Sequence, residues 1–409
     1  METAPLKKHE TVFQFRALCV IALGLSCGVF LGSVLERIWL LTAVCASLMC
    51  MLFLTFSGLP KAALLFASFA LGVLRMGAYR LLPLDSSVLP AVQAVTAFLS
   101  SLREALFSAS DALFPNNAAL LKGMLFGYRA ELSSNTLSAF RATGLSHILA
   151  LSGMNISLYA FLILLVIPKK YRVTCFFTVG IFSLLYCAVA AFPSSLVRAA
   201  VMTQCVLLSG VFKRRSDLPA SLSLAAVVLL LVSPMQLFDL GYQLSFAAVF
   251  AIALFYEPLK EKLLFFGENI ASDVSLTVCG TLGTFPLSAH YFGEAAWLTL
   301  FSNILILPVA SLGLIVSLPA VLLYFLSPAV ASIPAYIGDL ATSITVRAAE
   351  LVAALPFAIS KFNTLPFSAV LLLYAGMALL SRYNLKKTAV KYLSGGTAFL
   401  LAALVLLVF

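Results

Sequence analysis

Long apolar stretches separated by short polar segments dominate the chain from residue 16 onward. Many are close to the roughly 20 residues that a helix needs to cross about 30 Å of hydrocarbon. We expect about ten or eleven membrane-spanning helices of this length. The apolar stretches lie near residues 16–35, 39–57, 60–80, 145–167, 172–192, 195–212, 218–233, 237–256, 274–292, 297–325, 366–381 and 392–409. The predicted fold class is an all-α, polytopic integral membrane protein with a broken central helix.

The connection 81–144 interrupts this pattern with two amphipathic segments. Helical spacing of apolar residues predicts a helix over 88–113, lying on the membrane or on the helix bundle. A second short helix is expected in SSNTLSAFRATG. Ser133 or Ser134 would be its N-cap, and Gly144 would take the left-handed conformation after its end.

Polar residues concentrate in one predicted span, in the stretch HILALSGMNI at 147–156. At 100° per residue, His147, Ser152, Gly153 and Asn155 do not share one helix face. A segment that is polar all round cannot face lipid, so other helices surround it or it lines a water-filled cavity. The helix is expected to break at Ser152-Gly153. The alternative is that these residues only pack helices tightly.

Other spans carry polar side chains that have two interpretations. Arg198 either contributes to a polar path or extends to the outer surface. Asp239 and Gln243 share a helix face at i and i+4, although Asp239 also suits a helix N-terminus. His290 and Asn303 lie in two neighbouring spans.

The formal net charge of +10 is explained by membrane topology, because cytoplasmic loops collect Lys and Arg. With a cytoplasmic N-terminus, the basic loops all fall inside and 81–144 falls outside. The basic loop residues are Lys7, Lys8, Lys61, Lys169, Lys170, Arg172, Lys213, Arg214, Arg215, Lys260 and Lys262. In the connection, Arg103, Lys122, Arg129 and Arg141 are balanced by four carboxylates, so no excess charge draws nucleic acid there.

Residues for metal, cofactor or nucleotide chemistry are sparse. The eight cysteines lie in apolar spans without a CxxC pair and are expected to be small core residues. Three histidines and no HExxH helix predict no metal site and no cofactor. With no GxxxxGK[ST] phosphate loop, any energy must come from a gradient or from another chain. The sequence therefore does not predict an enzyme.

Four stretches of the sequence resemble the ComEC-type DNA-internalisation competence protein family. In chain order they are LLKGMLFGYRAELSSNTLSAFRATGLSHILALSGMNISL, AFPSSLVRAAVM, KRRSDLPASLSLAAVVLLLVSPMQLFDLGYQLSFAAVFAI and TFPLSAHYFGEAAWLTLFSNILILPV. They are similar to the family's His-x-Leu-Ala-x-Ser-Gly turn, its Ser-x-x-x-Arg-Ala helix, its Gly-[FY]-Gln-Leu-Ser-Phe span and its Asn-x-x-x-x-Pro pattern. Asn155 stands where the signature often has a second His.

The resemblance implies a member that carries only the competence domain. The segment 81–117 is too short for the family's external OB-like domain, and no HxHxDH cluster of a metallo-β-lactamase-like domain follows residue 325. We expect an N-terminal three-helix membrane segment at 1–80, an external amphipathic connection at 81–117 and the competence transmembrane domain at 118–409.

The implied function is a channel that takes up single-stranded DNA across the bacterial cytoplasmic membrane in natural transformation. Strand passage needs a wet path with weak contacts to bases and phosphates. Expected partners are single-stranded DNA, membrane lipid, a separate nuclease, a DNA receptor and a cytoplasmic helicase-like motor; homo-oligomerisation stays open. The candidate residues along the path are Arg129, Arg141, His147, Ser152, Gly153, Asn155, Arg198, Asp239, Gln243, His290 and Asn303.

Two other functional classes remain open from the residues alone. A small-solute permease also explains a broken polar helix in the membrane. An intramembrane hydrolase would pair Ser152 with His290, but ALSGMN lacks the first glycine of a GxSG motif.

Overall fold

The computed structural model describes residues 17–35, 37–56, 60–81, 90–149, 151–168, 170–214 and 216–380. Within these ranges, eight helices are long and apolar enough to cross a membrane, and four shorter helices are also apolar. The predicted all-α, multi-pass fold is confirmed. The stretch expected near 392–409 lies outside the described residues.

The chain divides into two compact units, comprising residues 1–84, 217–258 and 365–409 in the first and 85–216 and 259–364 in the second. The first unit contains α1 (Ala17–Val34), α2 (Arg37–Phe56), α3 (Pro60–Leu81), α11 (Leu218–Val232), the 3₁₀ turn η2 (Pro234–Phe238), most of α12 (Leu240–Leu263) and α17 (Phe367–Leu380).

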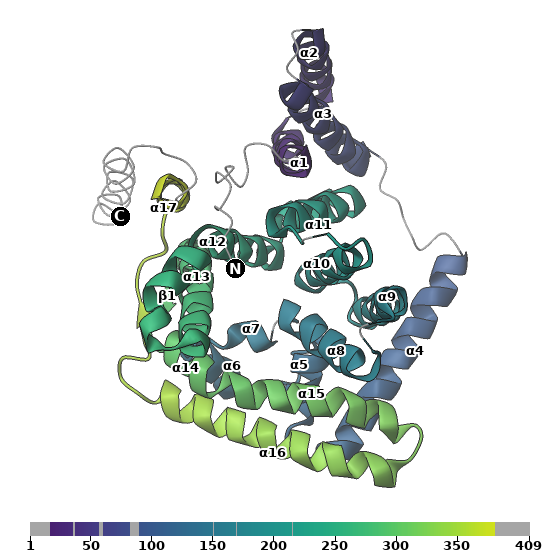
Figure 1. The fold of residues 1–409 in the computed structure, drawn as a ribbon, viewed down its shortest axis with the longest axis vertical. Helices are drawn as coiled ribbons and strands as arrows, with labels where there is room; N and C mark the ends of the chain where they lie inside the picture. Colours follow the sequence, from purple (N-terminus) through teal and green to yellow (C-terminus); the bar gives the residue numbers. More distant parts are fainter. Residues whose placement is uncertain are drawn as a thin grey trace, which may run out of the picture. The chain divides into compact units, whose positions relative to one another are not determined.

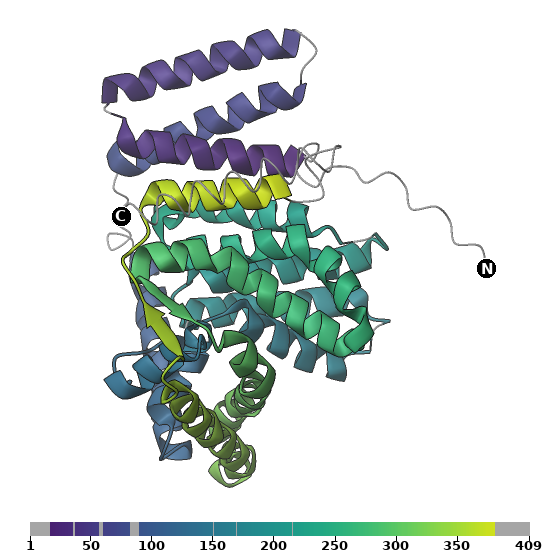
Figure 2. The ribbon, with the colours of Figure 1, turned by 90° about the vertical axis from the view of Figure 1, so that its left-hand side faces the viewer.

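Helix α1 packs closely along α3 in the first unit (Figure 2). A Cβ atom at Gly28 would lie 2.1 Å from the Phe69 carbonyl oxygen, so only glycine permits this approach. Arg75 donates to the carbonyl oxygens of Leu231 and Val232, at the end of α11. Arg80 donates to those of Gly32 and Leu35, at the end of α1. The C-terminal ends of α1, α3 and α11 therefore lie together.

The second unit contains the remaining helices and two short strands. They are α4 (Pro90–Leu113), α5 (Ala118–Phe126), α6 (Ser134–Ala142), α7 (Ser146–Leu149), α8 (Gly153–Val166), α9 (Arg172–Val189), α10 (Ser194–Val211), η3 (Leu264–Phe266), α13 (Glu268–Phe292), β1 (Glu294–Ala296), α14 (Thr299–Leu305), α15 (Leu307–Tyr324), α16 (Pro328–Ala353) and β2 (Ile359–Lys361). The two strands pair antiparallel, with Glu294 opposite Lys361. The sequence pattern does not predict this ribbon.

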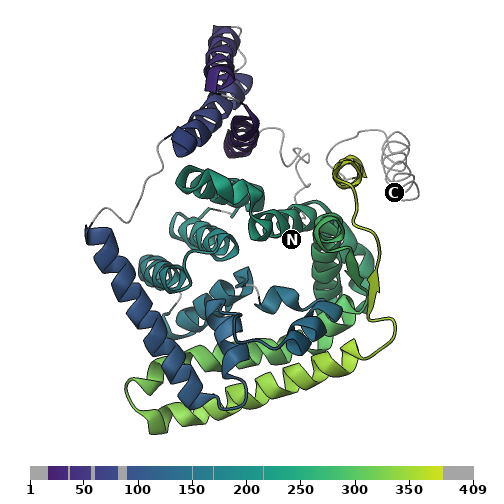
Figure 3. The same ribbon diagram turned by 180° about the vertical axis from the view of Figure 1, so that it is seen from behind.

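The α15–α16 hairpin supports α5, α6 and α8 in the second unit. Figures 1 and 3 show α15 and α16 lengthwise, whereas α9 and α10 are seen nearly end-on. The hairpin therefore runs across the direction of α9 and α10. The core of the unit lies around α5 to α8, where the side chains of Phe126, Phe140 and Ile148 are at most 1% exposed.

Helix α16 is absent from the stretches expected from hydropathy, although it is 26 residues long. Pro334 and Asp339 interrupt its run of apolar residues. The Asp339 carboxylate accepts hydrogen bonds from Asn116 Nδ2 at 3.0 Å and Asn117 Nδ2 at 2.7 Å, in the turn between α4 and α5. These contacts satisfy the polar side chain, which makes it compatible with a packed helix.

The amphipathic helix expected over 88–113 is present as α4, and its second half is more buried than its first. Leu106 is 5% exposed, whereas Val95 and Phe98 are 57% and 65% exposed. The short helix α6 forms as expected, because Ser133 Oγ accepts from the Thr136 backbone N–H. Gly144 has φ 74°, the left-handed conformation predicted for it.

Candidate functional site

The helix interruption predicted at Ser152-Gly153 is confirmed. Helix α7 ends at Leu149, Leu151 is not helical, and α8 begins at Gly153. Ser152 has extended backbone angles, φ −101° and ψ 162°, and is the N-cap residue of α8. Polar backbone groups that a continuous helix would pair internally are therefore left for other partners.

Two side chains from elsewhere bind the carbonyl groups at this interruption. Arg129 Nε donates to the Leu149 oxygen at 3.0 Å. Ser195 Oγ, in the first turn of α10, donates to the Leu151 oxygen. Irregular backbone is tolerated at membrane depth only where protein or water satisfies it, and these two bonds meet that requirement. Ser195 was not among the residues expected from the sequence.

The interruption lies at the N-terminal end of α10, because Ser195 reaches it from the first turn of that helix. At the opposite end, Arg172 donates to the Gly210 carbonyl oxygen and joins the start of α9 to the end of α10. Helix α8 has 14 residues, which corresponds to about 21 Å and is shorter than the hydrocarbon thickness.

Gly153 lies close to α10. A Cβ atom there would lie 3.1 Å from Ala199 Cβ and 3.3 Å from Arg198 Nη2. Arg198 also directs Nη1 toward Met202 Sδ at 3.3 Å. The guanidinium group therefore lies beside the helix interruption, next to the positive end of the α8 dipole.

Asn155 is fully buried, and its side chain forms hydrogen bonds to α5 and α9. Its Nδ2 donates to the Met124 carbonyl oxygen at 2.9 Å and to the Tyr186 hydroxyl at 3.1 Å. Tyr186 in turn donates to the Leu125 carbonyl oxygen at 2.6 Å. Side chains of α8 and α9 thus satisfy two carbonyls at the C-terminal end of α5. These contacts favour the packing interpretation for Asn155.

His147, Arg129 and Arg141 are solvent-accessible. The Nδ1 atom of His147 lies 3.0 Å from the Gly144 carbonyl oxygen, which leaves Nε2 for another partner. Burial, and then the like charge of Arg141, lower the pKa of the Arg129 guanidinium, which indicates that these two cations are close. Among the described residues neither forms an ion pair. Both remain charged at neutral pH.

Lys122, in contrast, is buried, and its positive charge is balanced by carboxylates. Its Nζ lies 2.7 Å from Asp111 Oδ1 and 2.8 Å from Glu131 Oε2. Burial disfavours the charged form, but the two carboxylates outweigh it and raise the pKa of Lys122. This cluster ties α4 and α5 to the segment that carries Arg129.

Asp239 and Gln243 belong to the first unit and bind helix termini there. Asp239 Oδ2 accepts from the Tyr242 backbone N–H at 2.8 Å, which is the N-terminal role considered for it. Gln243 Nε2 donates to the Leu237 carbonyl oxygen at 3.1 Å. The helix interruption belongs to the second unit.

His290 and Asn303 belong to the second unit, as the interruption does. The His290 ring packs edge-on against Tyr291, and Asn303 Oδ1 is buried without a hydrogen bond. Ser152 Oγ bonds weakly to Asn155 Oδ1 at 3.5 Å. Within the described part of the chain, Ser152 has no hydrogen bond to His290, so the hydrolase pairing has no geometric support.

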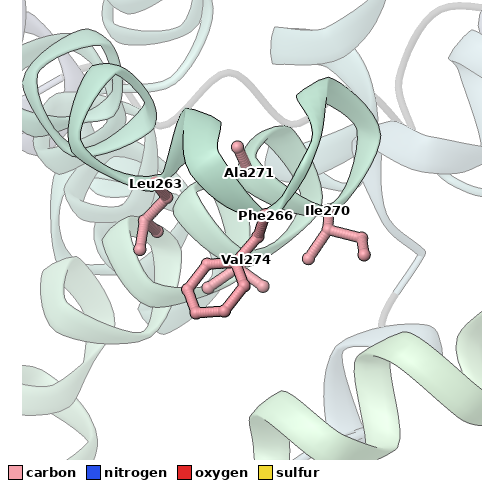
Figure 4. A pocket seen from close by; sticks show the side chains of 5 residues that line it. All are labelled: Leu263, Phe266, Ile270, Ala271 and Val274. Atoms are coloured by element: carbon pink, nitrogen blue, oxygen red, sulfur yellow. The ribbon is translucent and has the colours of Figure 1, made fainter.

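No group of three or more His, Cys, Asp or Glu side chains comes together as a metal site among the described residues. A cavity of about 190 Å³ lies at the turn between α12 and α13 (Figure 4). Its lining side chains are all apolar: Leu263, Phe266, Ile270, Ala271 and Val274. It offers no polar group to a nucleic acid.

Comparison with known proteins gives the family. ComE operon protein 3 of Bacillus subtilis (strain 168) is 26% identical over 215 residues, which cover 51% of this chain and 27% of that protein. The chain therefore spans about a quarter of that relative's length. No solved structure matches the chain significantly. The family model described as "Competence protein" matches residues 124–387, which include α6, the helix interruption and α16. The chain is therefore a member of the Competence protein family.

Proposed function

We propose that this protein passes single-stranded DNA across the cytoplasmic membrane during natural transformation. The helix interruption at the start of α8 carries the proposal, because two side chains from other elements stabilise it. A maintained interruption keeps polar backbone groups, with Arg198 beside them, inside an apolar helix bundle. Such an arrangement suits a polar solute that must enter the membrane.

Contacts to the strand come from the exposed cations beside the interruption. Arg129 and Arg141 offer guanidinium groups to phosphates, and His147 offers Nε2. A few such contacts retain a strand without trapping it, which passage requires. Gly153 and Arg198 form the next part of the path. Asn155 positions α5 and does not touch the strand.

The proposed orientation has a cytoplasmic N-terminus. The C-terminal ends of α1, α3 and α11 then lie outside, in agreement with their meeting through Arg75 and Arg80. The basic segments joined by the contact between Arg172 and Gly210 lie inside, as expected for cytoplasmic loops. The interruption then opens toward the outer face, where a strand arrives.

Other proteins supply the remaining steps under this proposal. A DNA receptor and a nuclease would deliver a single strand from outside, and a cytoplasmic helicase-like motor would pull it in. This division of labour rests on the sequence, which carries no phosphate loop and no nuclease motif.

Transformation of a deletion strain complemented with variants tests the proposal. Arg129→Gln with Arg141→Gln should lower transformation at least ten-fold at normal protein levels. The matched control is Lys170→Gln with Arg214→Gln, two exposed cations at the other end of α8 and α10; it should transform normally. Normal transformation by the deletion strain itself would refute the proposal.

A further inference from the structure

One exposed aromatic side chain is held in a fixed orientation in the second unit. Trp297 follows β1, and its indole is 65% exposed. Its backbone N–H donates to the Ala358 carbonyl oxygen at 3.1 Å, and its indole Nε1 donates to Ser360 Oγ at 2.8 Å. Both bonds attach it to the β2 segment. The ring therefore cannot turn freely, although most of its surface is uncovered.

The ribbon that holds Trp297 packs against the segment with the exposed cations. Helix α6 contacts β1. A Cβ atom at Gly144 would lie 2.1 Å from Thr299 Oγ1, so the turn after α6 touches the start of α14. Thr299 is two residues from Trp297, and Gly144 is three residues from both Arg141 and His147. Figure 1 shows β1 near α14. Trp297 therefore follows a strand that contacts the helix carrying Arg141, and the guanidinium group of Arg141 has no carboxylate partner among the described residues.

We infer that Trp297 is a base-stacking contact for single-stranded nucleic acid, beside the phosphate contacts of Arg129 and Arg141. An exposed aromatic face next to unpaired cations is the combination that binds single strands without regard to sequence. The inference rests on the proposed function and adds a base contact to it. A tryptophan that anchors at a membrane interface keeps its indole N–H for headgroups or water. Here Ser360 occupies that N–H, so only the ring face is offered.

The test uses Trp297 as its own reporter. The chain has two tryptophans, so Trp39→Phe leaves Trp297 as the sole indole fluorophore. The full-length protein in lipid nanodiscs is titrated with a single-stranded oligothymidylate. We expect saturable quenching of Trp297 that weakens as salt rises, since phosphate contacts release counterions. Arg141→Gln should shift the titration to higher oligonucleotide concentration. Brominated lipid chains, which quench only an inserted indole, should have little effect.

Affinity measured with a fluorescent oligothymidylate gives the second readout. Trp297→Leu should weaken binding roughly ten-fold, and Trp297→Phe should retain most of it because the aromatic face remains. Unchanged binding by Trp297→Leu, or quenching by brominated lipid without quenching by the oligonucleotide, overturns the inference in favour of a membrane anchor. If wild-type protein transports strands while Trp297 is unquenched, only this inference fails. If Trp297 is quenched but no strand crosses, the proposed function fails.

Discussion

Neighbouring polar residues around the interruption have different environments. Asn155 is buried against Met124 and Tyr186, whereas His147 remains accessible. Both partners of Asn155 are 31 positions away in the sequence. Helical periodicity locates a side chain on its own helix but does not identify what packs there. A buried amide that binds helix-terminal carbonyls stabilises the fold, and an accessible imidazole is free to meet a solute.

Asn155→Ala should destabilise the protein by about 1–3 kcal/mol, because the Met124 carbonyl loses its partner in a buried site. Thermal unfolding of the detergent-solubilised protein measures this. Ser157→Ala is the matched control, since Ser157 is exposed and bonds only to Gly153 of its own helix. Equal stability of Asn155→Ala and the control would contradict the packing role.

Gly153→Leu should abolish DNA uptake while folded protein remains in the membrane. The leucine would have to displace Ala199 or Arg198, which lie 3.1 and 3.3 Å from the Cβ position. Transformation frequency and membrane-protein level are measured together. Gly280→Leu is the control, because a Cβ atom there meets nothing within 4 Å. Normal uptake with Gly153→Leu would show that DNA uptake does not require the close contact of Gly153 with Ala199 and Arg198.

At the scale of elements, local chemistry was predictable and long-range pairing was not. Helix α6 was predicted from Ser133 and Gly144, because capping and a left-handed residue act within a few positions. Helix α16 is not predicted from the sequence, because a charged Asp339 is unexpected in an apolar helix. Its carboxylate is satisfied by Asn116 and Asn117, which are 223 and 222 positions away in the sequence. The β1–β2 ribbon was missed because three-residue strands carry almost no periodicity.

The helix interruption likewise combines a feature that local sequence predicts with a contact that it does not predict. Its position followed from Ser152 and Gly153, but its stabilisation by Ser195 depends on contact with α10. Ser195→Ala should therefore loosen the interruption and lower stability by about 1–3 kcal/mol, since the Leu151 carbonyl loses its donor. Protease accessibility near residue 151 should rise as well.

Thermal unfolding and limited proteolysis measure the two effects. Ser209→Ala serves as the control, because Ser209 bonds to Val206 of its own helix. Ser195→Thr keeps a hydroxyl group and should restore much of the loss. An unaltered digestion pattern for Ser195→Ala would show that the bond does not stabilise the interruption.

For the whole molecule, topology predicts which segments are accessible from outside the cell. Single cysteines are introduced at Ser108 and Lys170, both exposed, in a background without native cysteines. An impermeant thiol reagent should label Ser108→Cys in intact cells and Lys170→Cys only after the cells are opened. The opposite pattern would invert the proposed orientation.

Strand transfer by the purified protein tests the central claim most directly. The full-length chain is reconstituted alone in liposomes, and a labelled single strand is added outside with external nuclease applied at the end. We predict protein-dependent entry of intact strand, absent with Gly153→Leu, and no DNA degradation or ATP hydrolysis by the protein. Exclusion of the strand by folded wild-type protein, together with passage of a small solute, would contradict this account and favour a permease.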